Sequence, residues 1–277
     1  MTESPYRLDG PALVSFSGGR TSAYMLHEIL RVHDGLLPDG SVVAFANTGK
    51  ERPETLAFVA ACASHWNVRI RWVEFRKGES GFEEVGPNSA SRSGEPFAAL
   101  IAGKSYLPNW QARFCTSFLK VQPMFALMLS EHGLSPGQFS ENIGLRHDEG
   151  MRILRGLERA ENEGRRVRYP LAKARIVKAD VLAFWARQPF DLGLQSWEGN
   201  CDLCFMKGRR IRKRIIRDNP ASAVWWKQME EVTGGFFDRR DRVDQLIDEV
   251  RKSPTFFDEV DDSEYDVECG DGCGVEA

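Results

Sequence analysis

Val14-Ser15-Phe16-Ser17-Gly18-Gly19-Arg20-Thr21-Ser22 is the stretch from which the fold of this 277-residue chain can be inferred. The apolar run 12–16 predicts a buried strand, and Ser17, Gly18 and Gly19 predict a tight turn. Thr21 and Ser22 then open a helix, because apolar residues follow them at helical spacing: Tyr24, Met25, Leu26, Ile29 and Leu30.

A strand, a glycine-rich turn and a helix N-terminus together build an anion site. Glycines let the backbone approach the anion, free N–H groups point at it, and the helix dipole adds partial positive charge. The hydroxyls of Ser17, Thr21 and Ser22 can donate as well. The stretch therefore predicts a phosphate cradle, although it is neither a Walker loop nor Gly-x-Gly-x-x-Gly. Taken alone, Ser-Gly-Gly is equally consistent with an ordinary strand-to-helix turn.

Composition narrows the class of protein. A net charge of −3 and a pI near 6.0 give no overall bias toward nucleic acid. The sequence contains no run of 18 apolar residues and no signal-peptide pattern at its start, so we expect a cytoplasmic protein that does not enter a membrane. In that reducing setting six cysteines favour metal or redox chemistry over disulfides.

Two further strands and a helix extend the pattern. Residues 41–46 and 68–75 predict buried strands, and residues 54–66 predict an amphipathic helix in which Cys62 is a buried structural thiol. Alternating strands and helices predict a parallel sheet covered on both faces, with the site at the carboxyl ends of the strands. Residues 76–112 lack a sustained period and predict a long functional or mobile loop.

The remaining cysteines lie in three places. Cys115 precedes a predicted helix with Thr116 as its N-cap, where the dipole and Arg113 favour a thiolate. Cys201-x-x-Cys204 could be a redox dithiol, half of a zinc site, a pair of ligands at one corner of a metal cluster, or a chance pair. Cys269 and Cys273 lie among glycines in an acidic tail, where they could swing into a site, ligate a metal or remain in an unstructured end.

A basic helix follows the Cys-x-x-Cys pair. Residues from Lys207 to Arg217 include a run of arginines and lysines. They form either a solvated face or an electropositive surface for a polyanion, which leaves a nucleic-acid substrate open.

Five further motifs follow the Ser17–Ser22 stretch along the chain: Asn47-Thr48-Gly49-Lys50-Glu51, Arg113-Phe114-Cys115-Thr116 with Lys120 and Pro123, Gly144-Leu145-Arg146, Tyr169-Pro170-Leu171 and Gly199-Asn200-Cys201-Asp202-Leu203-Cys204. In this order they resemble the phosphoadenosine-phosphosulfate (PAPS) reductase-like family of the ATP-pyrophosphatase, or PP-loop, superfamily. The resemblance covers residues 12–230, with Thr21 where Asp is usual.

The resemblance implies an α/β fold similar to the adenine-nucleotide alpha-hydrolases, a Rossmann-like parallel sheet flanked by helices with a helical C-terminal region. It implies a PP-loop nucleotide-binding domain over residues 1–190, a Cys-x-x-Cys segment with helices over 191–254, and an acidic tail over 255–277. The phosphates of an adenine nucleotide would lie on the loop, and the adenosine near residues 44–48. The implied nucleotide-binding residues are Ser17, Gly18, Gly19, Arg20, Thr21, Ser22, Asn47, Thr48, Gly49 and Lys120.

The resemblance also implies two competing chemistries. Some members reduce PAPS or APS with a cysteine in a C-terminal Glu-Cys-Gly-Leu-His segment, which here reads Glu268-Cys269-Gly270 followed by Asp271-Gly272. Others split ATP to AMP and pyrophosphate so that sulfur can replace an adenylated oxygen. The DNA-phosphorothioation sulfurtransferases among them carry a cysteine pattern similar to Cys115-Thr116 and Cys201-x-x-Cys204.

The leading hypothesis is an ATP-binding enzyme of adenylation-linked sulfur transfer, assisted by Mg²⁺. Cys115, Cys201 and Cys204 would hold a [4Fe–4S] cluster, with Cys273, Cys269 or an exogenous group as a fourth ligand and Zn²⁺ as the competing metal. Arg146 would pair with phosphate or sulfate. The alternatives are a sulfonucleotide reductase with Cys269 as nucleophile, and a non-catalytic nucleic-acid-associated module. The expected partners are an adenine nucleotide and a sulfur or electron donor protein, and the chain could be a homodimer.

Overall fold

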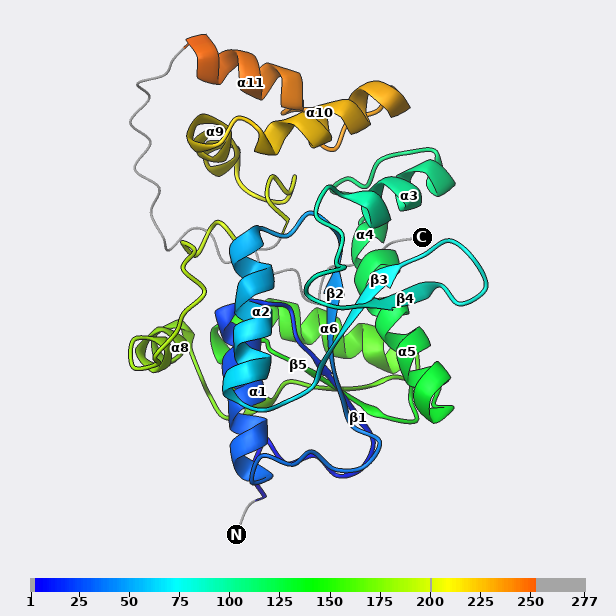
Figure 1. Cartoon of the computed structure of the whole chain (residues 1–277), viewed down its shortest axis with the longest axis vertical. Coiled ribbons are helices and arrows are strands. Elements are labelled where there is room, and N and C mark those ends of the chain that lie inside the picture. Colours follow the sequence, from blue (N-terminus) through cyan, green and yellow to red (C-terminus); the bar gives the residue numbers. More distant parts are fainter. Residues whose placement is uncertain (1–2, 200, 253–277) are drawn as a thin grey trace.

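The computed structural model describes residues 3–199 and 201–252. Its centre is a six-stranded sheet in the order β4-β3-β2-β1-β5-β6 (Figure 1). The strands are β1 (Ala12–Ser15), β2 (Val42–Asn47), β3 (Ile70–Phe75), β4 (Phe82–Val85), β5 (Ser140–Ile143) and β6 (Arg166–Arg168). All neighbouring pairs are parallel except β3 with β4. The predicted α/β fold with a mainly parallel sheet is therefore confirmed.

The first half of the chain supplies six of the helical segments. They are α1 (Arg20–Val32), α2 (Pro53–His65), α3 (Glu95–Lys104), α4 (Phe114–Thr116), the π-helical turn η1 (Ser117–Val121) and α5 (Gln122–His132). The segment after β5 contains a 3-10 turn η2 (His147–Glu149), α6 (Gly150–Asn162), α7 (Pro170–Lys173) and α8 (Lys178–Trp185).

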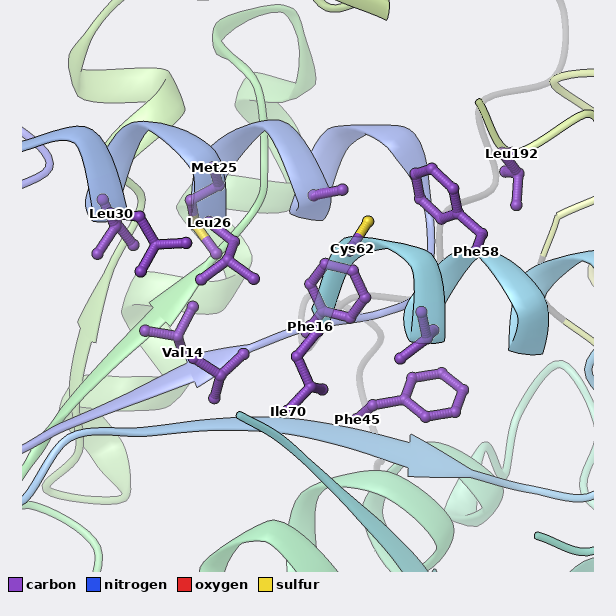
Figure 2. Packing of buried hydrophobic residues seen from close by; sticks show 14 of the residues in the cluster. Val14, Phe16, Met25, Leu26, Leu30, Phe45, Phe58, Cys62, Ile70 and Leu192 are labelled. Atoms are coloured by element: carbon purple, nitrogen blue, oxygen red, sulfur yellow. The ribbon is translucent and has the colours of Figure 1, made fainter. Parts of the chain in front are cut away.

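Alternating side chains of the strands divide the core into two layers. Val14 and Phe16 point from the β1 segment toward α1 and α2, as Figure 2 shows. Leu13 points to the opposite face and packs with α5, including Met128. Because each face of the sheet is covered by helices, the strands are apolar on both sides, which explains their continuous apolar runs. Cys62 is fully buried in the first layer, as predicted, and burial raises the pKa of its thiol.

The C-terminal helices form a separate layer around their own apolar cluster. They are α9 (Arg209–Asp218), α10 (Ser222–Thr233) and α11 (Val243–Lys252). Trp226, Phe237 and Ile215 are buried there against Phe97 of α3 and Phe114 of α4. Figure 1 shows these helices stacked above the end of the sheet at which β2 stops. This layer therefore lies at the carboxyl edge, where the site was expected.

Two local predictions were wrong. Residues 76–112 are not one irregular loop, because β4 pairs with β3 and α3 packs Phe97 into the C-terminal cluster. That strand is short and at the sheet edge, so its sequence carries little periodic signal. Thr116 is not an N-cap either: helix α4 begins at Phe114, and Arg113 takes the N-cap position.

No helix among the described residues combines the length and the apolar character needed to cross a membrane.

Candidate functional site

The loop between β1 and α1 is held in a conformation that only glycine adopts easily. Gly18 has φ +78°, and a Cβ there would lie 2.7 Å from Cγ2 of Thr55 and 3.1 Å from Cε2 of Phe45. The loop backbone thus packs directly on the first turn of α2. This close approach is what the glycine-rich turn provides.

The hydroxyls at the two ends of the loop bond to each other. The Ser17 N–H donates to Oγ of Ser22 at 3.1 Å, and the two hydroxyl oxygens are 2.9 Å apart. Ser22 Oγ also donates to the Gly19 carbonyl at 3.0 Å. No side chain caps the N-terminus of α1. These bonds close the loop into the ring of backbone expected of a phosphate cradle.

Arg146 reaches the loop from the end of β5. Its guanidinium is buried and donates to Oγ1 of Thr21 at 3.3 Å and to Asp148 at 3.0 Å. A Cβ on Gly144 would lie 3.0 Å from the Ser22 Cα, so this glycine lets the β5 segment approach α1. The structure therefore brings Arg146 to the predicted phosphate loop across 125 residues of sequence.

Arg20 lies at the mouth of the loop, where its side chain binds protein groups. Its Nε donates to Asp191 at 2.7 Å, and a second nitrogen donates to the Leu194 carbonyl at 2.8 Å. The hydrogen bonds from this guanidinium lower the pKa of Asp191. Trp185 donates to the Arg20 carbonyl at 2.9 Å. Through these hydrogen bonds Arg20 holds the segment after α8 next to the phosphate loop.

A pocket lies between the loop and that segment. Its walls combine the loop, residues 17–21, with the side chains of Thr55, Arg146 and Lys178. The opposite wall is partly apolar and includes Val181, Leu182 and Leu192, followed by Gln195 and Ser196. Among the described residues that line the pocket there is no Asp or Glu. A pocket with cations, hydroxyls and a helix N-terminus but no lining carboxylate suits an anion.

The loop after β2 is organised by a buried polar network that the sequence did not reveal. Asn47 Nδ2 donates to Glu74 at 2.6 Å and to the Ser91 carbonyl at 2.8 Å. Asn47 Oδ1 accepts from the Gly49 N–H at 3.2 Å. Glu74 is fully buried at the end of β3 and also accepts from the backbone and hydroxyl of Ser91. The sequence showed only a carboxylate near the end of the β3 segment, which by itself does not distinguish a buried anchor from a surface charge.

The same loop contacts the segment that carries the cysteine pair. Thr48 donates from its N–H and hydroxyl to Glu51, each at 2.9 Å. Its hydroxyl also lies 3.6 Å from Sγ of Cys201. Glu51 and Cys201 form a β-bridge, and the Asp202 N–H donates to the Lys50 carbonyl at 2.8 Å. Asn47, Thr48 and Gly49 are buried here and do not line the phosphate pocket.

Cys201 and Cys204 lie in one turn, in which the Cys204 N–H donates to the Cys201 carbonyl at 3.4 Å. Both are buried in the C-terminal apolar cluster, and Cys115 packs against the same cluster. Burial, and then the charge of Glu51, raise the pKa of Cys201, whereas Lys120 lowers it. No group of three or more His, Cys, Asp or Glu within the described ranges is arranged to hold a metal ion. The predicted ligands Cys269 and Cys273 lie outside those ranges.

Lys207 is a buried cation next to the cysteine turn. Its ammonium donates to the backbone carbonyls of Glu198 and Asp202, both at 3.2 Å. Burial lowers its pKa to about 8, although the two cysteines act in the opposite direction. A buried ammonium is compatible with thiolates close by, because it offsets their negative charge.

Replacing Lys207 by Met should change how stability depends on pH. Between about pH 8 and pH 10.5 the folded lysine has lost its proton and the unfolded lysine retains it. The unfolded state therefore binds more protons, and wild-type stability should rise with pH relative to Lys207→Met by about 3 kcal/mol across this window. Urea unfolding with chelator and reductant at each pH measures the difference. The control Lys227→Met, at a half-exposed side chain, should leave the slope unchanged, and an equal slope for both variants would contradict the assignment.

The basic helix α9 is largely paired within the protein. Arg212 is buried and binds Asp238 and Asp241, and Arg209 binds Asp241 and Glu249. Further ion pairs join Lys213 to Glu249 and Arg217 to Asp218. These ion pairs give several cations of residues 207–217 a role within the protein, which neither sequence-based alternative, a solvated face or a surface for a polyanion, had included.

The fold and the site together define an α/β protein with a glycine-rich loop after its central strand. Residues 11–152 match the family described as the Phosphoadenosine phosphosulfate reductase domain. The chain belongs to this family. The match contains the loop, the Asn47 segment, Cys115 and Arg146, whereas the motifs at Tyr169 and at Cys201–Cys204 lie beyond it.

Two individual proteins are similar to this chain. One is an uncharacterized nin region protein, ORF290, of Escherichia phage lambda, 31% identical over 204 residues. That match covers 70% of this chain and 66% of the phage protein, just under two thirds of its length. The other is the solved structure of the U34-tRNA thiolase NcsA from Methanococcus maripaludis with its [4Fe-4S] cluster. It has a TM-score of 0.34 and 11% identity, with 84% of this chain and 74% of that chain covered.

Proposed function

We propose that this protein binds ATP with its polyphosphate on the Ser17–Ser22 loop and catalyses adenylation-linked sulfur transfer. In such a reaction an acceptor oxygen attacks the α-phosphorus and pyrophosphate leaves. A sulfur nucleophile then displaces AMP from the adenylated acceptor. The observation that carries the proposal is the pocket in which Arg146 and the loop meet without a lining carboxylate.

Three groups would stabilise the polyphosphate. The N-terminus of α1 supplies free backbone N–H groups and partial positive charge. Arg146 supplies a buried guanidinium, which suits a pyrophosphate leaving group because it can bind two oxygens at once. Mg²⁺ would be held mainly by the phosphates, because the described lining residues offer it no carboxylate.

The cysteine turn would provide the sulfur chemistry. Cys201 and Cys204 lie in one turn, and Cys115 packs against the same cluster, which supports a shared centre although the described residues do not form an assembled set of three ligands. A [4Fe–4S] cluster held by these three cysteines would leave one iron able to bind sulfur. The contact between Thr48 and Cys201 joins this centre to the nucleotide side of the site. Zn²⁺ is the competing metal.

The test is direct. Protein purified without oxygen should contain iron and absorb visible light, and it should form AMP and pyrophosphate from ATP when a sulfur acceptor is present. A colourless, iron-free protein that still binds ATP would overturn the cluster and leave the nucleotide site standing. Protein that binds no adenine nucleotide would overturn the whole proposal.

Replacing Arg146 by Met should weaken ATP binding by about 10- to 100-fold, because a charge-assisted hydrogen bond to the polyphosphate is lost. Isothermal titration with ATP measures this loss. Arg155→Met is the matched control, since Arg155 is exposed on α6. Equal affinities for the two variants would show that Arg146 does not bind the phosphates.

The second candidate is a sulfonucleotide reductase, which the family description favours. Its nucleophile would be Cys269, in a segment outside the described residues. Sulfite release from PAPS by the wild type, and its loss in Cys269→Ser, would establish this activity. Sulfite release that persists in Cys269→Ser would exclude Cys269 as the nucleophile.

A further inference from the structure

Thr55 is a buried side chain of the pocket that neither the sequence motifs nor the contacts above use as a binding residue. It lies in the first turn of α2 and is 2% exposed. Its side chain lines the pocket together with Ser17, Gly18 and Arg146. Within the part of the chain that the structure describes, its hydroxyl oxygen has no hydrogen-bond partner.

The two branches of this side chain have different surroundings. The methyl Cγ2 packs on the phosphate loop, since it lies 2.7 Å from where a Cβ on Gly18 would stand. Loop packing therefore requires the methyl and not the hydroxyl, and valine would fill the same volume. A buried hydroxyl without a partner is unfavourable, so its presence beside a pocket calls for a partner that the ligand supplies.

The nearby hydroxyls of the loop already have partners. Ser17 and Ser22 bond to each other at 2.9 Å, and Thr21 accepts from Arg146 at 3.3 Å. Thr55 differs from all three because its hydroxyl has no such bond in the described residues. A ligand that bound this hydroxyl would therefore break no internal hydrogen bond of the described residues.

The electrostatic setting identifies the class of ligand. α1 and α2 each follow a parallel strand, so both begin at the carboxyl edge of the sheet and run side by side (Figure 1). Within the described part of the chain, no side chain caps the N-terminus of either helix. Two helix N-termini, together with Arg146 and Lys178 in the pocket wall, favour an anion beside Thr55.

We propose that Thr55 is a ligand-binding residue of the phosphate pocket, whose hydroxyl donates a hydrogen bond to an oxygen of the phosphoryl group on the Ser17–Ser22 loop. This inference rests on the proposed function, because it assigns the ligand of that same pocket to the polyphosphate of a nucleotide. α2 then contributes to binding through its first turn as α1 does, and the two helices hold the anion from two sides.

Titration calorimetry with ATP and with inorganic pyrophosphate tests the assignment on the full-length protein. Thr55→Val keeps the methyl packing and removes the hydroxyl, so it should weaken both probes by about 10- to 100-fold. Its melting temperature should stay the same or rise, because an unpartnered buried hydroxyl has been removed. Thr55→Ser keeps the hydroxyl and should retain affinity within about 3-fold. Thr233→Val, in α10, is the control and should not change affinity.

The outcomes separate this inference from the proposed function. If Thr55→Val binds both probes as the wild type does, the hydroxyl makes no ligand contact and the inference is overturned. The same holds if Thr55→Ser loses as much affinity as Thr55→Val. If the wild type binds neither ATP nor pyrophosphate, the proposed function fails first and the inference fails with it.

Discussion

Replacing Gly18 by alanine should lower the free energy of unfolding by about 2–4 kcal/mol and abolish ATP binding. Two costs add. An alanine at φ +78° is strained, and its Cβ would lie 2.7 Å from the Thr55 methyl and 3.1 Å from the Phe45 ring. The loop would have to leave α2 to relieve the contact, and the backbone N–H groups would no longer converge on the phosphates. Urea unfolding and isothermal titration measure the two effects.

Gly133 provides the matched control. It caps α5 with φ +67°, and a Cβ there would meet nothing within 4 Å. Gly133→Ala should therefore show only the conformational cost, about 1–2 kcal/mol, with ATP binding intact. If Gly18→Ala is no more destabilising than Gly133→Ala and binds ATP normally, the close packing of the loop on α2 is not required for the site.

Replacing Asp202 by alanine should destabilise the protein by about 3–5 kcal/mol, because it leaves the charge of Lys50 buried and unpaired. The Lys50 ammonium lies 3.0 Å from the Asp202 carboxylate, and their side chains are 9% and 17% exposed. The same carboxylate accepts from the Trp226 indole at 2.7 Å. Asp202 thus fastens the cysteine turn both to the loop after β2 and to α10, and its loss should loosen the turn. Thermal and urea unfolding measure the effect.

A double-mutant cycle with Lys50→Met isolates the pair. If the ion pair is the cause, Asp202→Ala should cost much less when Lys50 is already Met. Asp244→Ala serves as the control, because its ion pair with Arg242 is exposed and should be worth less than about 1 kcal/mol. Additive costs for Asp202→Ala and Lys50→Met would contradict the coupling.

How much the sequence could predict depended on how local each signal was. Local signals were enough to predict the loop at Ser17–Ser22, strands β1, β2 and β3, and the burial of Cys62. Apolar spacing and glycine positions act over a few residues, so the sequence shows them directly. Strand β4 was missed. It has only four residues at the sheet edge, and its pairing with β3 is what stabilises it.

The site was predictable in its types of residue and less so in their contacts. Arg146 was expected at the phosphates, and the structure places it against Thr21. Glu74 and Asp202 were not expected to matter, although each joins two loops. A single carboxylate within an apolar or mixed segment has no sequence pattern that distinguishes an internal anchor from a surface charge.

By itself the sequence determined that a glycine-rich loop follows a central parallel strand, because a strand, a glycine turn and a helix start are encoded by adjacent residues. Only the tertiary structure decided what surrounds that loop. It placed Thr55 under Gly18 and Arg146 at Thr21, and it placed Cys201 at Thr48 across 153 residues of chain. It also placed acidic side chains of residues 238–249 next to cations of α9, with which they form ion pairs. The physical reason is that these contacts depend on the order of strands in the sheet and on side-chain packing between distant segments, which local spacing does not encode.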